Sequence, residues 1–431
     1  MKKRKVVFVC HYFPPQDNVG IRRVTFWANY FVNHGYEVTV LTTKKYNSEL
    51  LYKQVSSSVN VIEFSFIKTT LVNKVINEEV EEAKLNKSDS SPLVGPLIYL
   101  KRSFINPIFG QIVDYRLISV FGFMAQYRLG INKSLVQKYV CSDSTVISTA
   151  PPWPVHILGV FLKSKLQAKF IADYRDPFSN NHMFSSLFTF LENKIDKYIC
   201  RQADAVVTVS PSWVELYNQK ADNVHLIRNG FDETMFIDNG SQATNKRSNS
   251  IKLNYFGTIE HPKRFPQSLF DYLVSSELDI EVCFYGKCPL VAEHLSKTPA
   301  LNSKIKLKGH KPYNETIEIM KESSFNLVCE SVGNPELSEK GLIPTKIYEY
   351  IACNRPIVAL VDPESDILNL LSDSGLLAHS ISDIKDLDSL FRKLEGYNHC
   401  YDVALDTSLL SRQRQALDLM SLEQKIHEVI I

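Results

Sequence analysis

The sequence of 431 residues lacks the features of several protein classes. It contains no run of about 18 apolar residues, the length that a helix needs to cross a bilayer. It has no Cys-x-x-Cys pair and no cysteine–histidine group at zinc-ligand spacing, so its 8 cysteines are expected to be free, buried thiols in a reducing cytoplasm. Lysine and arginine number 49 against 47 acidic residues, without the positive excess typical of nucleic-acid binding. We therefore expect no membrane span, no metal and no nucleic-acid partner.

The amino-terminal residues have the charge, but not the length, of a secretory signal. Met1–Lys5 is basic, yet the apolar run Val6–Cys10 is far shorter than the apolar region of a signal peptide and leads into Pro14 and Pro15. We interpret this run as a buried first strand and expect a cytoplasmic protein.

Short runs rich in β-branched residues alternate with longer amphipathic stretches, such as Val24, Trp27, Ala28 and Phe31 at helical spacing. This alternation predicts an α/β fold, with parallel sheets covered by helices on both faces. The predicted strands are residues 6–10, 37–42, 59–64, 145–148, 169–172, 205–209 and 224–227, followed by 252–256, 280–285, 304–308, 325–329 and 356–360.

The strands fall into two groups, separated by the polar segment 238–250, which has the composition of a linker. We expect one doubly wound, Rossmann-like domain over residues 1–237 and a second over 251–410. The final helical stretch, 411–431, is expected to pack back on the first domain. Ligands bind beyond the carboxyl ends of strands in such sheets, so we expect the two domains to face a central cleft.

Residues 68–140 interrupt the first group of strands, and an insertion of this length is usually functional. Within it, residues 97–129 are rich in aromatic and basic side chains, including Lys101 and Arg102. One interpretation is a surface that docks on anionic lipid, since such side chains favour the membrane interface. The alternative is a helical layer whose aromatic side chains belong to the core of the first domain.

The turn after the first strand contains no G-x-G-x-x-G, which argues against a dinucleotide site. Instead, Gly20 precedes a helix whose first turn contains Arg22 and Arg23, and the amino end of a helix suits an anion. The alternative is a plain strand–helix turn with solvated arginines.

The segment IADYRDPF, residues 171–178, ends a predicted strand with Asp173, Arg175 and Asp176, at the edge of the sheet where ligands bind. The alternative is an aspartate–arginine ion pair that only holds a loop.

In residues 254–269 a strand ends at Gly257, and Lys263 and Arg264 open the following helix, so a cation there can reach an anion beyond the strand. Adjacent basic residues also form solvated faces, which is the alternative.

The segment 341–360 is the most specific of these patterns. Pro344 suits the first position of a helix. Lys346 and Glu349 follow one helical turn apart, so the lysine can meet a diphosphate and the carboxylate can accept hydrogen bonds from two ribose hydroxyls. The alternative is an exposed Lys–Glu pair worth a few tenths of a kcal/mol.

In their order and spacing, these segments resemble the family-four retaining glycosyltransferases, which have the GT-B fold. The resemblance covers nearly the whole chain and includes YFPP with Gly20, DYRDPF, ADAVVTVSPSWVE at 203–215, VHLIRNGFDETMF at 224–236, the YFG segment and KIYEYIACNRPIVAL. It implies an acceptor-side first domain and a nucleotide-sugar-binding second domain. It also implies transfer of a hexosyl-type sugar with retention of configuration, without a metal or other cofactor.

The resemblance implies roles for individual residues. Gly20 would lie near the sugar phosphate, Lys263 and Lys346 would neutralise the donor diphosphate, and Glu349 would hold the ribose. The implied catalytic residues are Arg175, Asp176 and Lys263; the implied donor-binding residues are Gly20, Gly257, Thr258, Lys263, Pro344, Thr345, Lys346 and Glu349; those expected on the acceptor or membrane side are Arg22, Arg23, Lys101, Arg102 and Asp114.

The chain departs from the family pattern around the donor site. Gly341 stands where the first glutamate of the family's E-x7-E element is expected, and Glu336 and Glu339 are nearby but off register. Thr258 stands where an arginine is common, which leaves Lys263 with more of the diphosphate charge.

A third departure concerns Arg175, which precedes Asp176 where many relatives have a histidine before an aspartate. This variant resembles the sub-group encoded in capsule and O-antigen clusters, whose acceptors are lipid-linked. It implies an enzyme of bacterial surface-polysaccharide synthesis with a peripheral contact to the inner face of the cytoplasmic membrane.

Residues 386–388 spell D-x-D, the metal motif of the other glycosyltransferase fold, but they lie in an amphipathic helical pattern that we interpret as a solvated helix face. Two other functions stay open. One is a nucleotide-sugar 2-epimerase of the same fold, and the other is a non-catalytic scaffold that binds a glycan or nucleotide.

Overall fold

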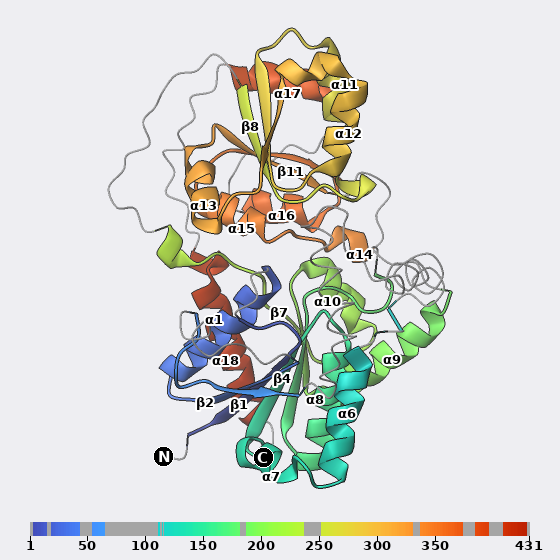
Figure 1. The fold of residues 1–431 in the computed structure, drawn as a ribbon, viewed down its shortest axis with the longest axis vertical. Helices are drawn as coiled ribbons and strands as arrows, with labels where there is room; N and C mark the ends of the chain where they lie inside the picture. Colours follow the sequence, from blue (N-terminus) through green and yellow to red (C-terminus); the bar gives the residue numbers. More distant parts are fainter. Residues whose placement is uncertain are drawn as a thin grey trace, which may run out of the picture. The chain divides into compact units, whose positions relative to one another are not determined.

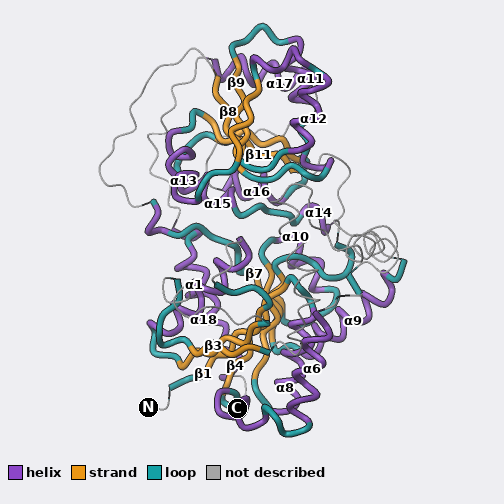
Figure 2. The backbone as a smooth tube through the Cα atoms, viewed as in Figure 1, coloured by secondary structure: helices purple, strands orange, loops and turns teal. Residues whose placement is uncertain are grey.

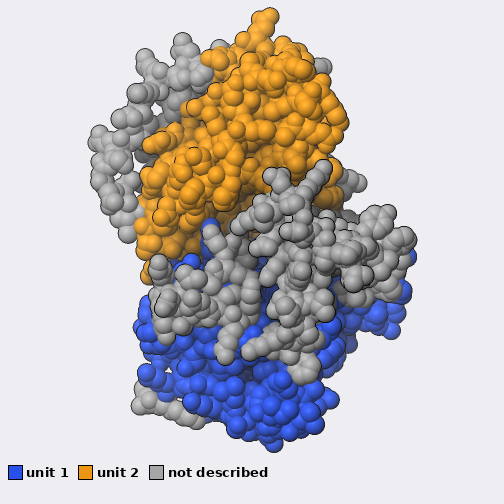
Figure 3. Space-filling model, in the orientation of Figure 1, with its two compact units in different colours: residues 1–209, 213–227, 416–431 blue, residues 210–212, 228–415 orange. Residues whose placement is uncertain are grey.

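The computed structural model describes residues 3–14, 19–43, 54–64, 111–112, 114, 116–181, 187–236, 251–330, 337–373, 384–395 and 408–428. They belong to two compact units, coloured separately in Figure 3. Unit 1 comprises Met1–Val209, Trp213–Ile227 and Ala416–Ile431, and unit 2 comprises Ser210–Ser212 and Arg228–Gln415.

The boundary after the first group of strands lies at Ile227 rather than at 237. Residues 228–236 belong to unit 2 because Phe231 forms a parallel bridge with Ser411, and the amide of Arg412 donates to the carbonyl of Phe231 at 2.8 Å. The predicted linker, 238–250, lies outside the described residues.

Unit 1 is built on a seven-stranded sheet of parallel strands in the order β3-β2-β1-β4-β5-β6-β7 (Figure 1). The strands are β1 Lys5–Cys10, β2 Glu37–Thr42, β3 Asn60–Glu63, β4 Ser144–Ala150, β5 Lys169–Tyr174, β6 Ala205–Thr208 and β7 Val224–Leu226. The helices are α1 Val19–Asn33, α6 Arg116–Arg128, α7 Lys133–Tyr139, α8 Pro154–Leu166 and α9 Thr189–Gln202. Unit 1 also contains α10 Pro211–Asn218 from Trp213 on and α18 Arg412–Glu428 from Ala416 on.

The two faces of this sheet carry separate hydrophobic clusters. One cluster joins the strands to side chains of α6, α8 and α9, and the other joins them to side chains of α1 and α18. Helices therefore cover both faces of the sheet, as the strand–helix alternation predicts (Figure 2).

The carboxy-terminal helix supplies part of that second cluster, through Leu419, Leu422 and Ile426. Its buried Glu423 accepts hydrogen bonds from Tyr36 Oη and from Thr145 Oγ1, both at 2.9 Å. Residues 416–431 are therefore part of unit 1, although residues 228–415 before them belong to unit 2.

The described part of the predicted insertion forms α6 and α7. On α6, Phe123 and Tyr127 are core residues, which supports the helical-layer interpretation for these two aromatic side chains. Phe121 and Ile118 of the same helix are 53% and 52% exposed. Lys101 and Arg102 lie outside the described residues. Among the helices that the structure describes, none combines the length and apolar character that a bilayer crossing requires.

Unit 2 is built on a five-stranded parallel sheet in the order β10-β9-β8-β11-β12. The strands are β8 Ile251–Phe256, β9 Ile280–Tyr285, β10 Ile305–Gly309, β11 Phe325–Glu330 and β12 Ile357–Val361. The helices are α11 Gln267–Ser275, α12 Pro289–Lys297, α13 Tyr313–Glu322, α14 Leu337–Lys340, α15 Lys346–Ala352, α16 Asp366–Asp373 and α17 Ile384–Glu395. Side chains of α11, α12 and α17 join one hydrophobic cluster, and those of α13, α15 and α16 join another.

Candidate functional site

The turn that ends β8 requires glycine. Gly257 has φ of +134°, and Gly286, which follows β9, has φ of +131°. A Cβ atom on Gly286 would lie 2.2 Å from the carbonyl oxygen of Gly257, so the two turns are in close contact. Because neither glycine presents a side chain, the backbone at this edge of the sheet stays accessible to a ligand.

Lys346, the first residue of α15, lies beside this turn. Its Nζ is 3.6 Å from the centroid of the Tyr255 ring and 3.7 Å from the place that a Cβ on Gly257 would take. Burial lowers the pKa of Lys346 to about 8, and the nearby Glu330 carboxylate opposes that change. A desolvated ammonium at a glycine turn is suited to binding an anion.

Glu330 is a site residue that the sequence pattern did not indicate. It ends β11, and its Oε2 lies 3.0 Å from Nε of Arg264. Burial raises the pKa of the Glu330 carboxyl group, while Arg264 and Lys346 act against the rise. The sequence signal was a carboxylate directly after the predicted strand 325–329, without any indication of its partner.

The prediction that Lys263 and Arg264 open a helix is wrong. They form a 3-10 turn with Pro262, and this turn precedes α11. The turn forms because Pro262 cannot donate a backbone hydrogen bond and the ring of His261 accepts one from the amide of Lys263. The ammonium of Lys263 pairs with the Glu339 carboxylate. The two basic side chains therefore each face a carboxylate.

Glu349 lies on α15 with the core residues Ile347 and Tyr350. Its side chain is 6% exposed, and Tyr313 Oη donates a hydrogen bond to its Oε1 at 2.7 Å. The alternative of an exposed Lys–Glu pair is therefore wrong. Tyr350 fixes the helix to the sheet, because its Oη accepts from the amide of Phe256 at 3.2 Å and donates to a carbonyl of β11 at 3.3 Å.

Pro344, Thr345 and Thr258 complete the predicted donor-binding set in unit 2. Pro344 and Thr345 precede α15 and are half-buried, and the carbonyl of Thr345 accepts from the amide of Tyr348 at 3.2 Å. The carbonyl of Thr258 accepts a hydrogen bond from Tyr255 Oη at 3.4 Å. Thr258 therefore lies at the same strand end as Gly257, and Pro344 and Thr345 directly precede Lys346, whose Nζ reaches that strand end.

In unit 1, Arg23 is an interior residue and not a solvated one. Its Nη2 lies 3.0 Å from Oδ1 of Asp173 and donates to the carbonyl of Ile227 at 2.8 Å, while the guanidinium lies over the Trp27 ring. β5 continues through Asp173 because this residue pairs with Thr149, so its carboxylate points into the buried layer. The pair fixes α1 to the sheet.

Arg175 makes no ion pair with Asp173; it donates to backbone carbonyls of Gly20 at 2.8 Å, Pro151 at 3.0 Å and Ala150 at 3.1 Å. The alternative interpretation, in which an aspartate–arginine ion pair holds a loop, is therefore wrong for Arg175: its partners are main-chain carbonyls, although it does hold a turn in place. Gly20 is the second residue of α1 rather than the residue before it. Arg175 thus connects the first turn of α1 to the end of β4.

Asp176 and Arg22 are half-buried at the same edge of the sheet of unit 1. The Asp114 carboxylate accepts hydrogen bonds from the amide, Nε and Nη2 of Arg116, the shortest from Nη2 at 2.6 Å. Arg116 Nη1 donates to Tyr12 Oη at 3.2 Å. Asp114 is therefore committed to an ion pair at the start of α6.

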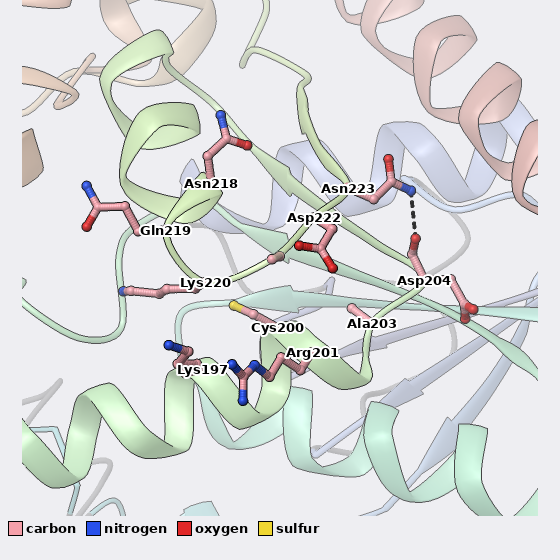
Figure 4. A pocket seen from close by; sticks show the side chains of 11 residues that line it. Lys197, Cys200, Arg201, Ala203, Asp204, Asn218, Gln219, Lys220, Asp222 and Asn223 are labelled. Carbon is pink, nitrogen blue, oxygen red and sulfur yellow. Dashed lines mark hydrogen bonds between the residues drawn. The ribbon is translucent and has the colours of Figure 1, made fainter.

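A polar cavity of about 400 Å³ lies elsewhere in unit 1 (Figure 4). Its lining residues directly precede β6 and β7, at the opposite edge of the sheet from Arg175, and include Asn223, whose Nδ2 donates to the carbonyl of Asp204 at 2.7 Å. Lys220, another lining residue, is held by Asp196 at 2.7 Å. We regard this cavity as part of the structural framework rather than of the candidate site.

The D-x-D sequence lies on α17, as the helical pattern predicts. The carboxylate of Asp388 accepts hydrogen bonds from Arg392 Nε at 2.7 Å and from Tyr272 Oη at 3.0 Å. Asp388 therefore joins α17 to Tyr272 of α11 and to Arg392 one turn further along its own helix.

No family model matches the chain, and no curated protein matches it. Among solved structures, sucrose-phosphate synthase from Thermosynechococcus elongatus is similar over 99% of this chain and 100% of that one, with 12% identity and a TM-score of 0.63. HepE from Anabaena, in complex with UDP-glucose, covers 99% of both chains at 12% identity and a TM-score of 0.57. The lipopolysaccharide outer core galactosyltransferase WaaB covers 97% of this chain and 99% of its own at 11% identity and a TM-score of 0.58. The chain therefore has the GT-B fold.

Proposed function

We propose that this protein is a glycosyltransferase that transfers a sugar from a nucleotide-sugar donor, and that unit 2 binds the donor. The observation that carries the proposal is the group of Lys346, Arg264 and Gly257 at the carboxyl ends of β8 and β11. The structures of similar fold include HepE with UDP-glucose and the galactosyltransferase WaaB, which supports a donor of this class.

The residues of unit 2 supply the interactions that such a reaction needs. Lys346, Arg264 and Lys263 stabilise the negative charge that develops on the leaving diphosphate, the role that a metal ion has in other enzymes. The turn at Gly257 allows a phosphate to approach the backbone. Glu349, held by Tyr313, accepts hydrogen bonds from the ribose hydroxyls.

The test is binding followed by turnover. Nucleoside diphosphates and nucleotide sugars are screened by thermal shift, and a ligand present at 100 times its dissociation constant should stabilise the protein by about 2.7 kcal/mol. The bound nucleotide sugar is then supplied with glycan acceptors, and transfer is followed by mass spectrometry. Lys346→Met should lose the shift, whereas Lys306→Met, on the edge strand β10, should keep it. The proposal fails if no nucleotide stabilises the wild-type protein.

Turnover distinguishes the proposal from two alternatives. A nucleotide-sugar 2-epimerase would form product without any acceptor. A non-catalytic scaffold would bind the nucleotide sugar and return it unchanged after prolonged incubation with enzyme and acceptor.

We further propose retention of configuration and a lipid-linked acceptor in surface-polysaccharide synthesis, following the resemblance of the motifs. Nuclear magnetic resonance of the new glycosidic linkage tests retention, and inversion would contradict it. The exposed Ile118 and Phe121 on α6 support a peripheral membrane contact. Sedimentation with anionic vesicles at low salt tests that contact. Binding that the double change Lys101→Glu and Arg102→Glu leaves unaltered would exclude these cations.

A further inference from the structure

Glu330 is a buried carboxylate among the cations that the proposed function assigns to the diphosphate. Its side chain is 4% exposed, and Nε of Arg264 donates to it at 3.0 Å. A buried carboxylate is costly unless cations and hydrogen bonds face it. Glu330 and the cations around it therefore form one electrostatic group.

Lys346 belongs to the same group. Its Nζ lies 3.7 Å from the place that a Cβ on Gly257 would take, at the end of β8, and β8 pairs with β11, which Glu330 ends. The ammonium also lies over the ring of Tyr255, and the ionisable side chains with the largest electrostatic effect on it are Glu330, Cys329, Arg264 and Cys288. Burial raises the pKa of both thiols, so they are neutral near pH 7. Glu330 is thus the member of this set whose negative charge favours the protonated ammonium, while Arg264 disfavours it.

We propose that Glu330 is a positioning residue of the diphosphate site: it holds the guanidinium of Arg264 in place and keeps Lys346 charged, so that both cations meet the diphosphate together. This inference rests on the proposed function. Thr258, which follows Gly257 at the end of β8, carries no charge, and Arg264 supplies a guanidinium at the end of β11, the strand that pairs with β8.

The diphosphate site needs a carboxylate between Arg264 and Lys346 because these two cations repel each other. Arg264 and Lys346 both act on Glu330, and each is a positive charge in the surroundings of the other. Replacing Glu330 by glutamine keeps the shape of the side chain and removes its charge. The Lys346 ammonium then loses its favourable neighbour and keeps the unfavourable one, so it releases its proton at a lower pH.

The first experiment needs no ligand. Acetylation of lysine amines in the intact chain is followed over pH 6 to 10 by mass spectrometry of the peptide that contains Lys346. The midpoint should lie near pH 8 in the wild type and about one pH unit or more lower in Glu330→Gln. Glu339→Gln, which removes the carboxylate that faces Lys263, is the matched control and should leave the midpoint unchanged. An unshifted midpoint in Glu330→Gln would overturn the inference.

The second experiment follows the affinity for a nucleoside diphosphate by calorimetry from pH 7 to 9.5. A ligand that requires the charged ammonium loses about tenfold in affinity per pH unit above the lysine pKa. The decline should begin near pH 8 in the wild type and about one unit lower in Glu330→Gln. Lys346→Arg, which stays charged, should bind without the decline, and this result assigns the decline to Lys346. If Glu330→Gln does not fold, the double variant Glu330→Gln/Arg264→Gln, which leaves no unpaired charge, decides the question. Its decline should also begin at a lower pH than in the wild type, because Glu330 acts on Lys346 more strongly than Arg264 does.

The outcomes distinguish a failure of the Glu330 inference from a failure of the proposed function. A wild type that binds no nucleoside diphosphate contradicts the proposed function, while the labelling still decides whether Glu330 keeps Lys346 charged. A wild type that binds, with a pH decline that persists in Lys346→Arg or is unshifted in Glu330→Gln, contradicts the inference alone.

Discussion

Replacing Glu349 by glutamine turns one oxygen of a buried carboxylate into an NH2 group. The substitution removes the negative charge and leaves the side-chain volume nearly unchanged. The carboxylate is 6% exposed and receives a hydrogen bond of 2.7 Å from Tyr313. Hydrogen bonds to a charged group contribute about 1.5–3 kcal/mol each. If the ribose donates to this carboxylate, the substitution should weaken the binding of a nucleoside diphosphate by about 10- to 150-fold.

The assay is isothermal titration with a nucleoside diphosphate and with its 2′,3′-dideoxy analogue, at constant pH below 8. Glu349→Gln should lower the affinity for the ribonucleotide toward that of the analogue and should leave the analogue's own affinity unchanged. Tyr313→Phe is the matched control: it should have a smaller effect, and the two changes should not be additive, because the tyrosine acts through the carboxylate. Equal affinities of wild type and Glu349→Gln for the ribonucleotide would refute the ribose role.

Other predictions concern stability, turnover and metal. Lys220→Met removes one partner of a buried ion pair, in which the side chains of Lys220 and Asp196 are 8% and 0% exposed. It should lower the free energy of unfolding in urea by about 3–5 kcal/mol, and an unchanged midpoint would show that the pair is not needed. Arg175→Lys should lower both the melting temperature and turnover, since the donors of an ammonium all leave one nitrogen, whereas Arg175 reaches three carbonyls from Nε, Nη1 and Nη2 separately; full turnover would contradict a positioning role. Transfer activity should survive EDTA, and a requirement for added manganese would contradict the proposed chemistry.

Hydrophobic pattern was sufficient to predict the strands. Every strand of the described residues corresponds to a predicted one, and residues 37–42 and 280–285 agree at both ends. These runs are apolar because both faces of a parallel sheet are covered by helices, so the sequence itself carries the signal. The end of β5 was less visible, since it extends to Tyr174 through pairing with Ala150, and the sequence does not reveal that pairing.

The division of the chain was harder to predict, because it depends on contacts between distant residues. Residues 228–236 lie before a polar segment and were assigned to the first group of strands by their position in the sequence. Phe231 instead pairs with Ser411, a residue 180 positions later. Composition marks a polar segment, but it does not show which side of that segment the neighbouring residues pack against.

The candidate donor site shows the same distinction between local and distant contacts. The spacing of Lys346 and Glu349 on one short helix is local, and the sequence was enough to single them out. The contact of Arg264 with Glu330 spans 66 positions, and that of Lys263 with Glu339 spans 76. Neither carboxylate follows a spacing rule relative to its cation, so sequence reasoning identified the cations without the groups that hold them.

The charged residues of unit 1 show why a charge at the carboxyl end of a strand is an ambiguous signal. Arg23 pairs with Asp173 in the interior, and Arg175 donates to main-chain carbonyls. In both cases the guanidinium satisfies groups that the strand ends and helix ends leave open, which is a structural task. In unit 2, by contrast, the basic side chains of Lys263 and Arg264 face carboxylates while keeping 38% and 32% of their surfaces exposed. A cation held by a carboxylate and still in contact with solvent can meet an anionic ligand without breaking the fold. A guanidinium whose Nε, Nη1 and Nη2 all donate to backbone carbonyls is less available to a ligand, and this difference in partners is why we propose the donor site in unit 2.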